Sequence, residues 1–211
     1  VSTAATEIPV SIEKRVSQTI TASSISAKTV NDTSVSLSGV ATADSGAPVT
    51  YSNISGNDGV CNVSGTSVSI LGAGMCKIQV DADFFGFFTK TSDSLEFSIA
   101  GVAPTVATTD ATSIGVSTAT LNATVNARFI SSTVSIEYGT SATLAGSTTV
   151  SGTAVTGSTD TARGIAVTGL AAGTKYYFRA SATNSAGSTT ASAIKSFTTL
   201  GGKPSTTTAI T

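Results

Sequence analysis

The chain contains no histidine and no tryptophan, and only 11% of its 211 residues are charged. Histidine is the most frequent general acid or base at neutral pH and the commonest metal ligand, so its absence narrows the possible chemistry. The acidic residues are scattered along predicted strands and turns, with no base placed beside a nucleophile. We therefore expect no enzymatic activity and no bound cofactor or catalytic metal.

Basic stripes and long apolar runs are also lacking. The net charge is −1, and the 11 basic residues stand singly, so they do not form the basic patch that binds nucleic acid. We therefore expect no nucleic-acid partner. No apolar run approaches the roughly 20 residues that cross a bilayer, and the first residues lack the basic and apolar regions of a signal peptide. We expect no membrane insertion. The first residues are compatible with a signal peptide that has already been removed and with a segment of a longer protein.

Ser, Thr, Ala, Val and Gly dominate the composition, which favours extended structure over helices. Apolar residues repeat with the two-residue period of half-buried strands. This alternation is found at Val35/Leu37, Val49/Tyr51, Val68/Ile70, Ile78/Val80, Ala119 to Val125, Val134 to Tyr138 and Tyr176 to Ala182. The pattern predicts an all-β protein of antiparallel sheets.

The two cysteines, Cys61 and Cys76, lie in the most apolar stretch, residues 59–88. Strands around Val68 and Ile78 flank residues 71–74, whose glycines predict a hairpin turn rather than a phosphate loop, because the lysine of such a loop is absent. That hairpin would bring the cysteines within disulfide reach, closing a loop of about 15 residues worth ~3 kcal/mol. Zinc binding is disfavoured without histidine, and the spacing is not that of a redox motif.

A disulfide, few thiols and abundant Ser and Thr indicate an oxidising, extracellular setting. Four formal N-glycosylation sequons begin at Asn31, Asn53, Asn62 and Asn122. In so Ser/Thr-rich a chain, we interpret these sequons as chance occurrences.

The N-terminal segment, residues 1–15, contains the alternation Ile8, Val10, Ile12. Its spacing matches residues 95–99, so it imitates the last strand of a domain. It is either the end of a preceding repeat or a strand that pairs with the open sheet edge of a neighbouring molecule. The structural alternative is a frayed terminus or an extra edge strand on its own domain.

Residues 48–51, 59–65 and 69–78, which hold the paired cysteines, resemble the tandem Ig-like repeats of large bacterial surface proteins. The resemblance covers about residues 16–100 and implies an Ig-like β-sandwich, located at a bacterial cell surface or in a secreted protein. Residues 83–88 depart from it, because such repeats often carry a more polar segment there.

The departure consists of four phenylalanines around Gly86, namely Phe84, Phe85, Phe87 and Phe88. They form the largest aromatic cluster in the chain, and we expect them mainly to close the core of a sandwich that lacks tryptophan. The alternative is an exposed interaction surface for a protein or a glycan. Nearby carboxylates suit calcium but lack a full loop of oxygen donors; they are Asp81, Asp83 and Asp93.

Gly and Pro in residues 100–104 mark a domain boundary. Beyond it, residues 137–139, 170–176, 179–187 and 196–199 resemble a fibronectin type III domain over about residues 104–199. The resemblance implies that Tyr176 is the corner tyrosine whose hydroxyl ties its strand to nearby backbone. Many members place tryptophan where this chain has Leu121 and Val125, so we expect a lighter core. No Arg-Gly-Asp tripeptide is present.

The predicted organisation is two Ig-like or fibronectin type III-like sandwiches in tandem, over residues 16–100 and 101–200, with a linker at 201–211. We expect a structural spacer that contacts neighbouring modules or copies of itself, and self-assembles into a filament or surface layer by strand addition. One alternative is an adhesin module that binds glycan or protein through Phe84 to Phe88 or the sandwich-end loops. Another is an accessory module of a secreted polysaccharide hydrolase.

Overall fold

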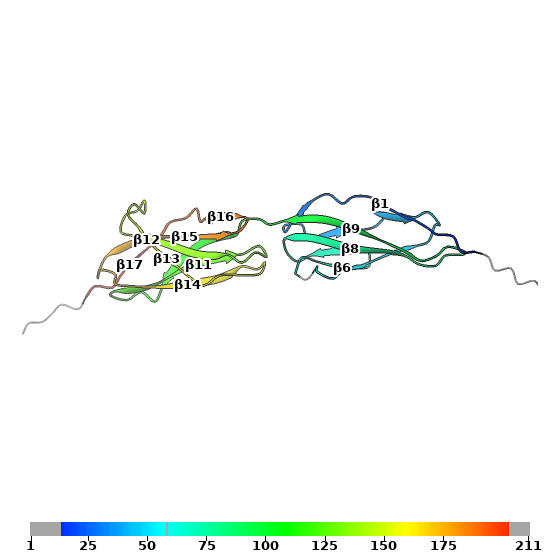
Figure 1. Ribbon diagram of the computed structural model, residues 1–211. Coiled ribbons are helices and arrows are strands. Elements are labelled where there is room, and N and C mark those ends of the chain that lie inside the picture. Colours follow the sequence, from blue (N-terminus) through cyan, green and yellow to red (C-terminus); the bar gives the residue numbers. More distant parts are fainter. Residues whose placement is uncertain (1–13, 58, 203–211) are drawn as a thin grey trace, which may run out of the picture. The chain divides into compact units, whose positions relative to one another are not determined.

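The computed structural model describes residues 14–57 and 59–202, and in this part of the chain all regular structure is β-strand. The predicted all-β class with antiparallel sheets is confirmed (Figure 1). The N-terminal strand predicted at Ile8, Val10 and Ile12 and most of the predicted linker lie outside the described residues. Within them, no helix has the length and apolar character to cross a membrane.

The chain divides into two compact units. The first comprises the described residues up to Ile99, apart from residues 29–31 and 72–74, which are grouped with the second unit together with the described residues from Ala100 onward.

The first unit is built from nine strands. They are β1 (Ile20–Ala22), β2 (Lys28–Thr29), β3 (Ser34–Ser36), β4 (Ala41–Ala43), β5 (Val49–Asn53), β6 (Cys61–Ser64), β7 (Ser67–Ile70), β8 (Gly74–Ala82) and β9 (Thr91–Ala100). A four-stranded sheet has the order β2-β9-β8-β5, a three-stranded sheet has the order β3-β7-β6, and β1 pairs with β4. Figure 1 shows β8 and β9 in one layer and β6 in the other.

The hairpin predicted across residues 71–74 is wrong. Strand β7 pairs with β3 and β6, whereas β8 pairs with β5 in the other sheet. The Gly-rich segment therefore carries the chain from one sheet to the other. Both strands alternate because each faces the same core, so their period could not distinguish a hairpin from a crossover.

Small and medium aliphatic side chains fill the first core. Leu37 and Val68 from one sheet and Ile78 and Val80 from the other are fully buried, and Phe97 on β9 is 3% exposed. This core therefore contains a buried aromatic ring that does not belong to the cluster at residues 84–88.

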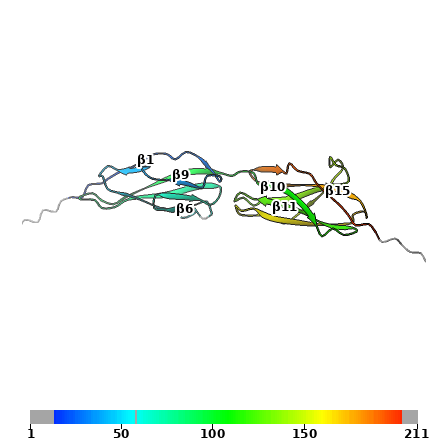
Figure 2. The same ribbon diagram turned by 180° about the vertical axis from the view of Figure 1, so that it is seen from behind.

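The second unit has eight strands. They are β10 (Thr105–Thr112), β11 (Thr118–Asn126), β12 (Thr133–Gly139), β13 (Thr148–Ser151), β14 (Thr161–Thr168), β15 (Lys175–Asn184), β16 (Gly187–Thr190) and β17 (Lys195–Thr198). One sheet has the order β10-β11-β14, and the other has the order β13-β12-β15-β16, with β17 also pairing with β15. Figure 2 shows β10 beside β11 from behind.

The second core is built without tryptophan. Leu121 and Val125 are fully buried between the sheets, and the space beside them is filled by Phe178 and Phe197. Phe178 is completely buried, and its ring meets that of Phe197 edge-on with centroids 5.9 Å apart. Two phenylalanines on neighbouring strands thus supply the aromatic volume of this core.

In each unit the chain arrives and leaves at opposite ends of the strands. In the first, Val16 bridges to Phe88 just before β9, and the chain leaves after Ile99 at the far end of this strand. In the second, Thr105 opens β10, whereas the Leu200 amide binds the Gly115 carbonyl beyond the other end of β10. We call these the amino end and the carboxyl end of each unit.

Candidate functional site

The aromatic cluster lies on the surface, at the amino end of the first unit. Phe84, Phe85 and Phe87 are 61%, 47% and 62% exposed, and Phe88 is half-buried. The expectation that these rings close the core is wrong, whereas the alternative of an exposed surface fits their burial. Beside them Val16 is 54% exposed. We name Val16, Phe84, Phe85 and Phe87 the aromatic surface.

Strand alternation does not govern the aromatic residues, because they lie in the connection between β8 and β9. The Phe88 amide donates to the Phe85 carbonyl at 3.0 Å, which closes a tight turn. Gly86 takes a φ of +56°, a left-handed conformation that side chains disfavour. Residues in such a turn lack the regular alternation of a strand, so their side chains are not directed in turn toward the core.

The chain segment leading into the first unit holds this turn in place. The Val16 amide donates to the Phe87 carbonyl at 3.0 Å, and the Thr89 amide donates to the Val16 carbonyl at 2.9 Å. These bonds join the segment to the turn as a short parallel bridge. The exposed rings therefore stand on a backbone fixed by pairing.

Gln18, which is only 3% exposed, also holds the turn in place. Its amide nitrogen Nε2 contacts the carbonyl oxygens of Ala82, Asp83 and Thr89, the latter two at 2.9 and 2.6 Å. Its Oε1 accepts a hydrogen bond from the Ser45 hydroxyl. The sequence analysis missed this role, because a lone glutamine before a strand looks like any surface glutamine.

A cation lies against the aromatic surface. The Arg15 guanidinium carbon is 4.6 Å from the centre of the Phe84 ring, within cation–π range. Lys14 and Lys90 are exposed nearby in the chain, and so are the carboxylates of Asp83 and of Asp44, which accepts a hydrogen bond from the Thr19 amide at 3.0 Å. The amino end therefore combines apolar rings with charges of both signs.

The two cysteines form a disulfide, with their Cα atoms 5.7 Å apart. Because Cys61 lies on β6 and Cys76 on β8, the bond links the two sheets rather than two arms of a hairpin. Cys76 is fully buried and Cys61 is 3% exposed. The bond is a buried cross-link between the two sheets of the sandwich.

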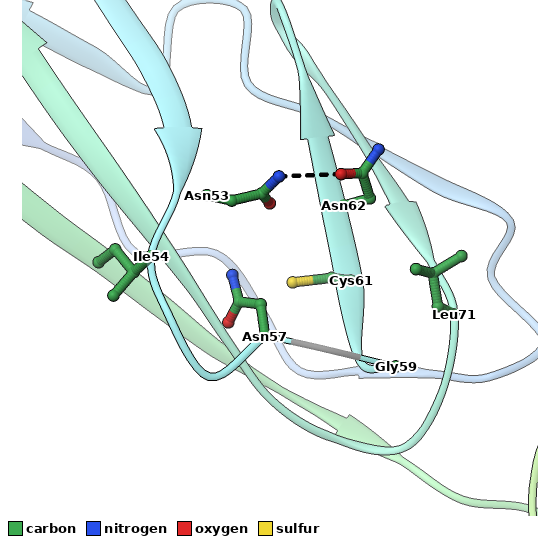
Figure 3. A pocket seen from close by; sticks show the side chains of 7 residues that line it. All are labelled: Asn53, Ile54, Asn57, Gly59, Cys61, Asn62 and Leu71. Carbon is green, nitrogen blue, oxygen red and sulfur yellow. Dashed lines mark hydrogen bonds between the residues drawn. The ribbon is translucent and has the colours of Figure 1, made fainter.

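A small cavity of about 180 Å³ lies beside the disulfide and is drawn in Figure 3. Its amides bind each other or the backbone: Asn53 Nδ2 donates to Asn62 Oδ1 at 2.8 Å, and Asn57 bonds both the amide and the carbonyl of Lys77. Two sequon asparagines, Asn53 and Asn62, are thus paired with each other. The hydrogen-bonding groups of this cavity serve the fold.

The carboxylates considered for calcium are not brought together. Among the described residues there is no group of three or more His, Cys, Asp or Glu side chains that could hold a metal ion. Hydrogen bonds from the Ser92 hydroxyl and the Gln79 amide lower the pKa of Asp81. This carboxylate works as a local acceptor across the strands.

Tyr176 ties its strand to the preceding loop. The Ala171 amide donates to the Tyr176 hydroxyl oxygen at 2.9 Å, and the ring stacks on Phe197 with centroids 5.7 Å apart. The first unit has a similar tie that the sequence analysis missed, from the Ala41 amide to the Tyr51 hydroxyl at 3.1 Å. A tyrosine hydroxyl thus accepts a backbone hydrogen bond in each unit, from the start of β4 in the first and from a loop in the second.

Tyr176→Phe is expected to lower the free energy of unfolding of the second unit by about 1 kcal/mol, since it removes the acceptor of one hydrogen bond and keeps the ring. Urea unfolding followed by intrinsic fluorescence measures this change. The matched control is Tyr177→Phe on the same strand, because the Tyr177 hydroxyl makes no hydrogen bond to any described residue and its loss should change little. Equal effects of the two substitutions would contradict the role of the tie.

No protein-family profile matches the chain, and no curated protein matches it. Several solved structures are similar at low identity. The sensor domain of the anti-sigma factor RsgI4 of Pseudobacteroides cellulosolvens is 18% identical, with a TM-score of 0.36, over 51% of this chain and 99% of that one. Domains FN1–FN3 of chicken CNTN1 are 16% identical, with a TM-score of 0.38, over 72% and 54% of the two chains. Domains A168–A170 of titin are 16% identical, with a TM-score of 0.32, over 88% and 67%.

Proposed function

We propose that this chain is a non-enzymatic spacer segment of a bacterial secreted or cell-surface protein, made of an Ig-like sandwich followed by a fibronectin type III-like sandwich. The observation that carries the proposal is that the chain crosses each unit from end to end. A module with its termini at opposite ends lengthens a chain, whereas one with adjacent termini does not.

Internal ties support a load-bearing role. The disulfide Cys61–Cys76 joins the two sheets of the first unit, and a tyrosine hydroxyl in each unit accepts a hydrogen bond from the backbone. In the second unit, Arg179 on β15 and Glu137 on β12 lie opposite each other in one sheet and form an ion pair at 2.8 Å. The disulfide also favours an oxidising, extracellular setting. Assembly by the strand at Ile8, Val10 and Ile12 belongs to this proposal.

Duplicating residues 101–200 within the chain should increase its maximum dimension by roughly 30 to 40 Å, the length of a strand of 9 or 10 residues plus its turns. Small-angle X-ray scattering at several protein concentrations measures this increment and separates it from association. The control is a chain lengthened by ten Gly/Ser residues at position 201. An increment no larger than that of the control would contradict the spacer role.

A second candidate is an adhesive contact through the aromatic surface, favoured by the exposure of three phenylalanine rings. Exposed rings stack on sugars and anchor protein interfaces. Glycan-array binding that is lost in Phe84→Ser/Phe87→Ser and kept in Met75→Ser, another exposed apolar side chain, would favour this candidate over a pure spacer.

A further inference from the structure

Two neighbouring strand edges of the first unit are open. Strand β5 ends the sheet β2-β9-β8-β5, and β6 ends the facing sheet β3-β7-β6, with no further described strand beyond either. The two edges lie side by side, because Asn53 Oδ1 on β5 accepts a hydrogen bond from the Val63 amide on β6 at 2.9 Å. A groove of about 350 Å³ lies along β5, and we name it the edge groove. It is lined by Val49, Thr50 and Tyr51 of β5 and by Gly65 and Thr66 of the turn that joins β6 to β7.

The core is incompletely covered beside the edge groove. Tyr51 on β5 is half-buried, although Val80, its cross-strand partner on β8, is fully buried. On the other sheet, Val63 of β6 is half-buried opposite the fully buried Val68 of β7. Paired residues point to the same face of a sheet, so both half-buried side chains point inward. Their exposure shows that the core is open at this side of the sandwich.

The second unit shows how such an edge is closed. Its strand β12 corresponds to β5, because each pairs with the long strand, β15 or β8, whose other side pairs with the last strand of the unit. Strand β13 pairs with the outer side of β12 and places Val150 opposite Ile136. Val150 packs against the core, and Val134 and Ile136 are fully buried. The partner that β5 lacks among the described residues is therefore a strand with an apolar inward face.

One segment outside the described residues has the sequence of such a strand. In residues 7–13 the apolar side chains occur at every second position, which places them on one face of a strand; they are Ile8, Val10 and Ile12. Pro9 has no amide hydrogen, but alternate residues direct their backbone groups to opposite edges, so pairing through the three apolar residues does not need it. Residues 203–211 contain one large apolar residue, Ile210, and do not alternate.

The length of the chain favours an edge in a second copy over the segment's own unit. Val16 is hydrogen-bonded to Phe87 and Thr89, next to the start of β9, and both β8 and β5 lie between β9 and the open edge. A strand added to β5 lies three strand spacings from β9, which is about 14 Å. The chain from Ile12 to Val16 spans at most about 14 Å when extended, so no length remains for the turns.

We propose that residues 7–13 of one copy of this chain pair as a strand with the open edge of β5 in a second copy and place their apolar side chains in the edge groove. The inference rests on the proposed spacer function and deepens it, because it names the acceptor of the predicted strand addition. Each copy has one donor segment and one acceptor edge, so the contact leaves one of each free and generates a line of molecules. Pro9 cannot donate from the other side of the added strand, so that strand ends the sheet.

Mixing two variants of the full chain tests the inference. The donor variant, Ile8→Ser/Val10→Ser/Ile12→Ser, lacks the apolar side chains of the segment, and the acceptor variant, Thr50→Lys/Thr66→Lys, carries two charges at the edge groove. A strand of this length is small beside the roughly 20 to 30 residues per partner of a standard interface, so association should be weak. Sedimentation velocity up to ~1 mM should show wild-type chains growing beyond dimers, each variant alone as a monomer, and the mixture as dimers that grow no further.

Controls and a second measurement locate the contact. Thr50 and Thr66 are exposed, so thermal melts should show the acceptor variant folded. The matched control Thr105→Lys/Thr168→Lys adds the same charge at exposed strand positions of the second unit and should associate like wild type. Hydrogen exchange should slow by about 10-fold at the edge-facing amides of Val49–Asn53 when the donor variant is mixed with the acceptor variant, because those amides become paired.

Other outcomes overturn the proposal. Wild-type chains that stay monomeric would show that the edge groove takes no strand from a second copy, and slow exchange at β5 in such a monomer would assign the edge to the chain's own segment. Self-association of the donor variant would assign the contact to other residues, the aromatic surface included, and self-association of the acceptor variant would assign it to another edge. None of these outcomes alters the length increment that tests the spacer role, so the two proposals fail separately.

Discussion

Phe178→Ala is expected to lower the free energy of unfolding of the second unit by about 3 to 5 kcal/mol. Phe178 is fully buried on β15, and its ring packs edge-on against Phe197. The chain contains no tryptophan, and the facing positions Leu121 and Val125 are too small to fill the cavity that the truncation would leave. The loss is a large part of the 5 to 15 kcal/mol that typically stabilises a domain.

Urea unfolding followed by circular dichroism measures this loss, with the transition of the second unit moving to lower urea. The transition of the first unit should not move. The matched control is Phe87→Ala, because Phe87 is 62% exposed and its truncation leaves no cavity; its effect should lie within about 0.5 kcal/mol. A loss below about 1 kcal/mol for Phe178→Ala would show that this core collapses around the missing ring.

Removing the disulfide by Cys61→Ala/Cys76→Ala is expected to cost the first unit about 3 kcal/mol, since the bond closes a loop with a sequence separation of 15. The cost arises mainly because the cross-link restricts the unfolded chain. Both side chains are also buried, which adds a smaller packing loss.

Thermal or urea unfolding in the presence and absence of reductant measures this effect. Reductant should destabilise the first unit of the wild-type chain and leave the double-alanine variant unchanged. The second unit has no cysteine and serves as an internal control. A wild-type first unit that is indifferent to full reduction, with free thiols verified by alkylation, would mean that the bond adds no stability.

Alternation in the sequence predicted the strands because it has a local cause. Successive side chains on a strand point to opposite faces, so the two-residue spacing alone predicts the burial of Leu121, Val125 and Phe178. Pairing between strands has no such local cause. Residues 71–74 look the same whether they close a hairpin or cross between sheets, and the predicted hairpin between β7 and β8 was wrong for this reason.

The candidate site was foreseen only in part. The cluster Phe84 to Phe88 stood out in the sequence, but its burial depended on whether the first core needed more aromatic volume. Phe97 is the phenylalanine buried in that core, whereas Phe84, Phe85 and Phe87 lie exposed around the turn at Gly86. Gln18 gave no signal at all, since the carbonyls that it binds lie more than 60 positions away in the chain.

By itself, the sequence determined the all-β class, the buried faces of the strands and the two cysteines available for a bond, because these follow from side-chain periodicity and composition. Only the tertiary structure decided which strands pair, that the disulfide spans two sheets, and that the chain crosses each unit from end to end. It also decided that apolar side chains remain exposed at the amino end of the first unit and the carboxyl end of the second. These features depend on contacts between distant residues, which local patterning does not specify.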